Sequence, residues 1–347
     1  MSSGQLARFV VWTGWVSCLC SIALTLANPD LARSVVVQWS PWLFGLLLVG
    51  IPHGALDHRI GSELSSMDGP TPVSAAGLRF YAAYLTTAGL VLAIWFAWPI
   101  AALTGFLAIA AIHFGQGDVY WSHRFGLAAR SGSVGYRTLL LLTRSVLPVA
   151  LPLLAFPGEL SGSAELMVSR LFGHSGPSIQ PQAIGVGLSG LAVIVGLQVG
   201  WACWLARCGD FATRRAAALD IVETYLLVAL FGIVPPVLAL GVYFNAWHSL
   251  RHLARLLLTT SSTRELVESR HWLAALRDLY KNTLPMTCGA VLLIAIVSCV
   301  VGRFQVSVVG LGMLALVGLS MLTIPHVLVV TFMDARQGVW SSLPDRG

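Results

Sequence analysis

The chain has 347 residues, of which 10% are charged and 56% are hydrophobic, and its mean hydropathy is +0.78. Soluble domains carry about 25% charged residues and cannot bury this much apolar surface, so the composition excludes a soluble enzyme and a disordered chain. It predicts an all-α, polytopic transmembrane helix bundle. The net charge of +6 does not indicate a nucleic-acid partner, because the basic residues are scattered between apolar runs and form no basic patch.

Ten apolar stretches are each long enough to cross a bilayer as a helix, which takes about 20 residues. We expect the first to be a retained spanning helix rather than a signal peptide. Pro99 separates the third stretch from the fourth, and Pro235 and Pro236 separate the seventh from the eighth, as at helix starts and tight turns. The predicted spans are residues 9–27, 39–56, 78–98, 99–121, 137–156, 183–206, 215–233, 234–257, 283–302 and 308–333.

The basic residues are divided unequally between the two sides of this predicted bundle. The side that holds the N-terminus receives 17 of the 21 Lys and Arg residues, the other side receives three, and Arg144 falls within a helix. The positive-inside rule therefore predicts cytoplasmic N- and C-termini in the cell (inner) membrane. Residues 258–282, rich in Arg, Glu and Ser, are predicted to be a cytoplasmic amphipathic connector within a single integral-membrane domain, residues 1–347.

Five of the nine histidines lie inside predicted spans that all run in the same direction. At 1.5 Å per residue, their positions place them about 20–27 Å from the non-cytoplasmic side, in one layer. Two of them are four residues apart and share a helix face, a spacing that presents two imidazoles to one metal. We predict a polyhistidine metal site, and a proton relay is the competing interpretation. The five are His53, His113, His248, His252 and His326.

Several other polar residues fall near this layer. Glu223 either forms a buried ion pair with Arg144 or orients a ligand histidine through its second ring nitrogen. Asn245 lies about one turn before the two closely spaced histidines on a similar face. Asp57 and Asp118 lie near predicted helix ends, where each is either a hydrogen-bond acceptor for a ligand histidine or an interfacial charge. For Asp118 we favour the interfacial charge.

Aromatic residues also lie near the layer. Their default role is core packing, and the alternative is that they line a site for an apolar substrate. The candidates are Phe114, Tyr243, Phe244 and Trp247.

The segments around these histidines resemble the signatures of the Brp/Blh family of bacterial and archaeal β-carotene 15,15'-dioxygenases. GIPHGALD at residues 50–57 is similar to the first signature, and HFG at residues 113–115 with Asp118 is similar to the second. YFNAWHSLRH at residues 243–252 is similar to the third, and the Pro325-His326 pair is similar to a fourth. The resemblance extends from the second predicted span to the tenth.

The resemblance implies an integral membrane enzyme that cleaves β-carotene with O2 at its central 15,15' double bond and yields two molecules of all-trans-retinal. It also implies a non-haem Fe(2+) site, and zinc would not serve because O2 activation requires a redox-active metal. The implied metal ligands are His53, His113, His248 and His252. Each of four further residues is expected to be either a fifth metal ligand or a residue that orients a ligand histidine. These residues are His326, Glu223, Asp57 and Asn245.

The implied partners are β-carotene, O2, the lipid bilayer and, as a functional link, a retinal-binding rhodopsin. Because β-carotene dissolves in bilayers, lateral entry between helices is expected. Two alternatives stay open. One is the cleavage of a different carotenoid or apocarotenoid, and the other is a non-enzymatic proton or metal transporter that uses the histidine layer.

Overall fold

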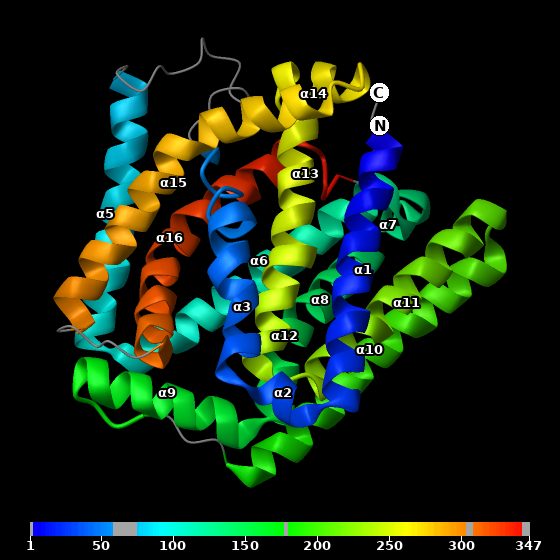
Figure 1. Cartoon of the computed structure of the whole chain (residues 1–347). Helices are drawn as coiled ribbons and strands as arrows, with labels where there is room; N and C mark the ends of the chain where they lie inside the picture. The colour runs from blue at the N-terminus through cyan, green and yellow to red at the C-terminus, as the bar shows by residue number, and fades with distance from the viewer. Residues whose placement is uncertain (1–2, 58–74, 177–179, 303–307, 342–347) are drawn as a thin grey trace.

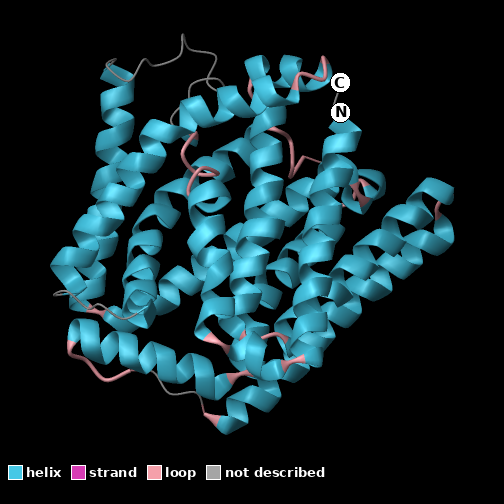
Figure 2. Ribbon diagram, in the orientation of Figure 1, coloured by secondary structure: helices cyan, strands magenta, loops and turns pink. Residues whose placement is uncertain are grey.

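The computed structural model describes residues 3–57, 75–176, 180–302 and 308–341, and helices dominate these ranges (Figure 2). No strand occurs in them, so the all-α prediction is confirmed for the described part of the chain. The elements (Figure 1) are α1 Ser3–Ala27, α2 Pro29–Arg33, α3 Val35–Gly45, η1 Leu46–Gly50, α5 Ala75–Ala97, α6 Pro99–Phe125, α7 Leu127–Ser131, α8 Val134–Ala155, α9 Pro157–Phe172, α10 Pro181–Cys208, α11 Phe211–Ile233, α12 Pro236–Val242, η2 Tyr243–Ser249, α13 Leu250–Thr259, α14 Ser261–Glu268, α15 Trp272–Gly302 and α16 Val308–Arg336.

Eight of the described helices are long and apolar enough to cross a membrane: α1, α5, α6, α8, α10, α11, α15 and α16. The other two predicted spans have a different character. The span at 39–56 overlaps a shorter apolar helix, Val35–Gly50, formed by α3 and η1. The span at 234–257 corresponds to α12, η2 and α13, which follow one another without a break. Both therefore contain a π-helical segment, and the total of ten spans stays a prediction.

Proline and short polar side chains set where the helices begin. Pro99 is the first residue of α6 and Pro236 the first of α12, which confirms the two predicted breaks. The Ser133 side chain accepts a hydrogen bond at the start of α8, and the Asp210 side chain does so at the start of α11. Hydrogen bonds from the side chain and backbone N–H of Thr213 hold the pKa of Asp210 below its usual range.

The helices pack so that several distant segments meet in the middle of the bundle. α8 packs against α6, α10 and α11, while α1 packs against α11, η2, α12 and α13. On another side, α5 and α15 both pack against α16. Figure 1 shows α9 lying across one end of the molecule and α14, which falls within the predicted connector, at the opposite end beside the start of α1.

Candidate metal centre

Five buried histidines meet between the helices, and we refer to them as the histidine cluster. His53 lies in the turn that follows η1, and His113 lies in α6. His248 lies in η2, His252 in α13 and His326 in α16. None of these side chains is more than 7% exposed. Segments far apart in the sequence thus contribute to one interior site.

The rings of the histidine cluster are close neighbours. The centroid of the His53 ring lies 5.0 to 6.3 Å from the centroids of the other four rings. His53, His113 and His326 each offer one ring nitrogen within 4.8 Å of the others. Nε2 of His248 lies 3.0 Å from Nε2 of His113. That separation fits a hydrogen bond, and it also fits two nitrogens bound at a right angle to one metal, since such bonds are about 2.0–2.1 Å long.

Two π-helical segments lie next to the histidine cluster. η1 ends at Gly50, shortly before His53, and η2 contains His248. Such segments are rare and are frequent at functional sites. The two segments pack against each other, and Nδ2 of Asn245 in η2 donates to the carbonyl oxygen of Pro41 in α3 over 3.0 Å. Asn245 therefore links η2 to α3.

Two rings of the cluster are held through Nδ1. Nδ1 of His326 lies 2.9 and 3.0 Å from the carboxylate oxygens of the buried Asp57. Nδ1 of His53 contacts the backbone carbonyl oxygen of Gly50. Metal-binding histidines usually donate one N–H to a carboxylate or carbonyl, so that the other nitrogen is presented to the metal. The position of Asp57 favours the interpretation in which it orients a histidine.

The remaining nitrogens of the cluster fit a metal ion. Among the described residues, Nε2 of His252 and Nε2 of His326 are buried without a hydrogen-bond partner. A buried polar group left unpaired costs about 1–3 kcal/mol, and a metal bound to such nitrogens would remove part of that cost. Imidazole is a suitable ligand for iron, zinc, copper and nickel. The donor set is therefore compatible with the expected Fe(2+).

Two glycines lie against rings of the cluster, and the absence of a side chain on each leaves space for the ring. A Cβ atom on Gly54 would lie 3.3 Å from Nδ1 of His326. A Cβ atom on Gly117 would lie 3.2 Å from Nδ1 of His248. Both distances are tight enough that an alanine would press on the imidazole. These glycines therefore contribute to the positions of the rings.

A cavity of about 580 Å³ reaches the cluster, and its volume is typical of small-molecule sites. His53, His113 and His326 form part of its wall, which is otherwise almost entirely apolar. The wall is built mainly by α5, α6, α15, α16 and the turn that follows η1. Such a site suits an apolar molecule with its reacting atoms beside the histidines.

The four aromatic candidates separate into two pairs. Phe114 and Phe244 line the cavity. Tyr243 and Trp247 are 0% and 1% exposed and belong to the packed core between the helices. Tyr243 and Trp247 thus have the packing role that the sequence left open for them.

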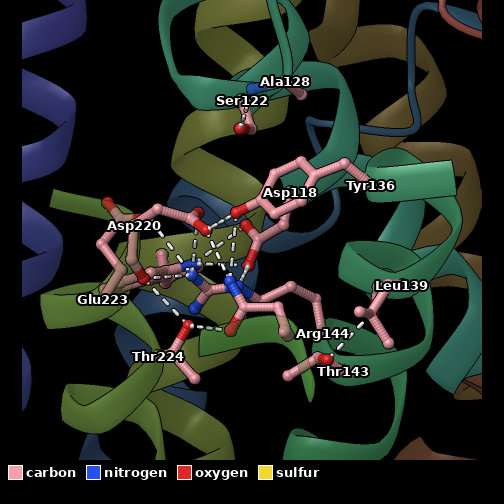
Figure 3. Close-up of polar contacts among 12 residues, drawn as sticks. Asp118, Ser122, Ala128, Tyr136, Leu139, Thr143, Arg144, Asp220, Glu223 and Thr224 are labelled. Atoms are coloured by element: carbon pink, nitrogen blue, oxygen red, sulfur yellow. Dashed lines mark hydrogen bonds and ion pairs between the residues drawn. The ribbon is translucent and has the colours of Figure 1, made fainter. Parts of the chain in front are cut away.

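A buried ion-pair network, part of which is drawn in Figure 3, lies close to the cluster. Nη1 of Arg251 lies 2.9 Å from Oδ1 of Asp118, and Nη2 of Arg251 lies 2.5 Å from Oε1 of Glu223. Nη2 of Arg144 lies 3.4 Å from Oδ1 of Asp220 and 3.9 Å from Oε2 of Glu223. Glu223 thus has the ion-pair role that was one of its two predicted alternatives.

Asp118 is not the interfacial charge that we favoured from the sequence. It is 4% exposed and accepts hydrogen bonds from Nε1 of Trp247, at 3.0 Å, and from Arg251. The guanidinium of Arg251 also lies 4.0 Å from the centroid of the Trp247 ring. The interfacial interpretation was wrong because Asp118 has a buried partner, Arg251. That partner lies 133 residues away in the sequence, so the pairing could not be predicted from local position. Asp118 therefore joins α6, which carries His113, to the segment that carries His248.

Comparison with known sequences identifies the family of this chain. A sequence model of the family described as beta-carotene 15,15'-dioxygenase matches residues 44–334. The chain belongs to this family. It is 31% identical to the probable beta-carotene 15,15'-dioxygenase Blh of Halobacterium salinarum, over 96% of this chain and 94% of Blh. It is 26% identical to the probable beta-carotene 15,15'-dioxygenase Brp of that organism, over 94% of this chain and 93% of Brp. No solved structure matches the chain.

The family match includes all five cluster histidines, but two parts of the site were not predicted from the sequence. Asp220 accepts hydrogen bonds from Tyr136 and Gln198 in the ion-pair network. The sequence marks Asp220 only as an acidic residue three positions before Glu223 in an apolar run, a spacing that places the two on the same side of a helix. The cavity wall from α5, α15 and α16 was also missed, because a leucine that faces a cavity resembles one that faces lipid.

Proposed function

We propose that this protein is a membrane-bound dioxygenase that cleaves β-carotene with O2 at the 15,15' double bond to give two molecules of all-trans-retinal. The observation that carries the proposal is a buried histidine cluster of which three rings, those of His53, His113 and His326, line an apolar cavity. The names of Blh and Brp support the same substrate for this chain.

We propose that the histidine cluster holds Fe(2+). The carboxylate of Asp57 leaves Nε2 of His326 available, and this nitrogen has no partner among the described residues, which supports His326 as a further ligand. When bound, Fe(2+) would supply the redox chemistry by which O2 reacts with an alkene, which amino-acid side chains cannot provide. The proposed ligands are His53, His113, His248 and His252, with His326 as the fifth.

The residues of the chain position the substrate and exclude water. Side chains such as Phe106, Phe114 and Leu319 provide apolar walls for a hydrocarbon chain. Asp57 holds a proton on Nδ1 of His326 and fixes the orientation of that ring. In the overall reaction one carbon–carbon double bond breaks and each half receives one atom of O2, so that two aldehydes form and no further reductant is needed.

We propose that the protein crosses the cell (inner) membrane ten times, with both termini in the cytoplasm and residues 258–282 as a cytoplasmic connector. The start of α1 and the end of α16 lie toward the same end of the molecule as α14, which supports an even number of spans (Figure 1). The excess of arginines on that side supports the orientation. The retinal produced would supply a retinal-binding rhodopsin, which we propose as a functional partner.

Expression in bacteria that accumulate β-carotene tests the proposed function. We expect the colour to fade and retinal to appear in extracts, with no change in cells that express the His113→Ala variant. Apocarotenals of unequal length would instead indicate a different cleavage position. Persistent colour despite good membrane expression would overturn the enzyme proposal, and proton or metal flux in proteoliposomes would then favour a transporter.

A further inference from the structure

The cavity beside the histidine cluster continues to the outer surface of the helix bundle. At its inner end the wall is formed by buried residues, His53, His113 and His326 among them. At its outer end the wall includes Leu85 and Leu292, which are 59% and 61% exposed. Because lining residues with this much exposure mark the mouth of a cavity, the site is open on the lipid-facing side.

The mouth lies between α5 and α15. Leu85 belongs to α5, while Gly289, Leu292 and Ile296 belong to α15. Both helices pack against α16, which provides wall residues such as Leu319, but within the described residues they have little contact with each other. Figure 1 shows α5 and α15 diverging toward the end of the molecule where α14 lies. The opening is therefore a lateral gap with α16 behind it.

Gly289 leaves space at this mouth. A Cβ atom built on it would meet no atom within 4 Å, so the space beside this wall residue is open. The cavity wall just inside is aromatic and aliphatic, with Phe80 and Tyr84 from α5 facing it. A passage of this kind disfavours polar molecules, which would lose their hydration, and favours a hydrocarbon that is already dissolved in the bilayer.

We propose that the gap between α5 and α15 is the portal through which a long apolar polyene enters sideways from the membrane, and that Gly289 determines its clearance. This inference rests on the proposed function, because the histidine cluster must act on a lipid-dissolved hydrocarbon. The elongated substrate slides past Gly289 with its ends along apolar walls, until its central bond lies near the histidines. The aldehydes formed leave through the same gap into the bilayer.

Substitution of Gly289 by tryptophan tests the portal. In the purified, iron-loaded protein we expect Gly289→Trp to raise the KM for β-carotene and to lower the amount of β-carotene that copurifies, each by about tenfold or more. The iron content per protein should stay at the wild-type level. The matched control is Gly196→Trp on α10, another glycine with no atom within 4 Å of its Cβ position and no place in the cavity wall.

A second pair of variants covers the case in which Gly289→Trp does not fold. Leu292→Trp adds bulk at the mouth, and Leu197→Trp adds it to an equally exposed leucine of α10. We expect only Leu292→Trp to raise the KM. If both mouth variants bind and cleave β-carotene like their controls while the wild type forms retinal, the portal is refuted and the proposed function stands. A wild-type protein that holds iron and forms no retinal would refute the proposed function itself.

Discussion

Nδ1 of His326 lies 2.9 Å from a carboxylate oxygen of Asp57, so the turn after η1 is joined to α16 at the histidine cluster. The two side chains come from positions 269 residues apart and are both buried. A carboxylate that accepts the Nδ1 proton makes the imidazole a stronger ligand and fixes the direction of Nε2. The pair thus has the arrangement of an outer carboxylate behind a metal-binding histidine.

Asp57→Asn should weaken iron binding about 10- to 100-fold, because an amide accepts the same hydrogen bond without the negative charge. Titration of the metal-free protein with Fe(2+) under anaerobic conditions measures the affinity. Asp210→Asn, at the exposed start of α11, is the control and should bind iron like the wild type. Unchanged affinity in Asp57→Asn would remove this carboxylate from the metal site.

The loss of His248 or of His252 should abolish stoichiometric iron binding, since each removes one proposed ligand. Iron is measured by elemental analysis of the purified protein alongside retinal formation. His271→Ala is the control, because His271 is exposed and contacts Ser269 away from the cluster. One iron per protein in both single variants would exclude these two residues from the ligand set.

Gly117→Ala should weaken iron binding by about tenfold, because the new methyl group presses on the His248 ring. Gly105→Ala on the same helix meets no atom within 4 Å and is the matched control. That control should keep its iron and gain up to about 1 kcal/mol of helix stability. Equal iron affinity in the two variants would show that space at Gly117 does not determine the ring position.

Asp118→Ala should destabilise the folded protein by about 3 kcal/mol, because the buried Arg251 loses one of its two carboxylate partners and Nε1 of Trp247 loses its acceptor. Thermal unfolding in detergent should give a clearly lower Tm. Glu159→Ala is the control. Oε1 of Glu159 lies 3.8 Å from Nε of Arg33, and both side chains are about half exposed. This control should change stability by less than about 1 kcal/mol. A Tm for Asp118→Ala equal to that of Glu159→Ala would contradict a stabilising network.

The sequence predicts the helices well because apolar runs and prolines act locally. Pro99 and Pro236 start helices where expected, since a proline at the first helical turn sacrifices no hydrogen bond. Because helix rise is constant, the sequence could place His113, His248, His252 and His326 at a similar depth. His53 lies in the turn after η1 and not inside the predicted helix. The π-helical segments η1 and η2 could not be predicted, because nothing in residues 46–50 or 243–249 marks a changed hydrogen-bond spacing.

Contacts between residues that are far apart in the sequence could not be predicted either. The buried role of Asp118 depends on Arg251 and Trp247, which only the packing of α6 against η2 and α13 brings near. Likewise, Leu85 and Leu292 are ordinary leucines of apolar helices until α5 and α15 are seen to flank one cavity. The histidines of the cluster were thus identifiable from the sequence, while the ion-pair partners beside them and the residues at the cavity mouth were not.

The most direct test of the central claim is the reaction balance of the purified, iron-quantified protein. β-Carotene consumed, O2 consumed and retinal formed are measured together in one sample. We expect two molecules of retinal for each β-carotene and each O2. We expect no product from the His113→Ala variant, because it lacks one proposed iron ligand. Products of unequal length, or no retinal from protein that holds its iron, would contradict central cleavage by the histidine cluster.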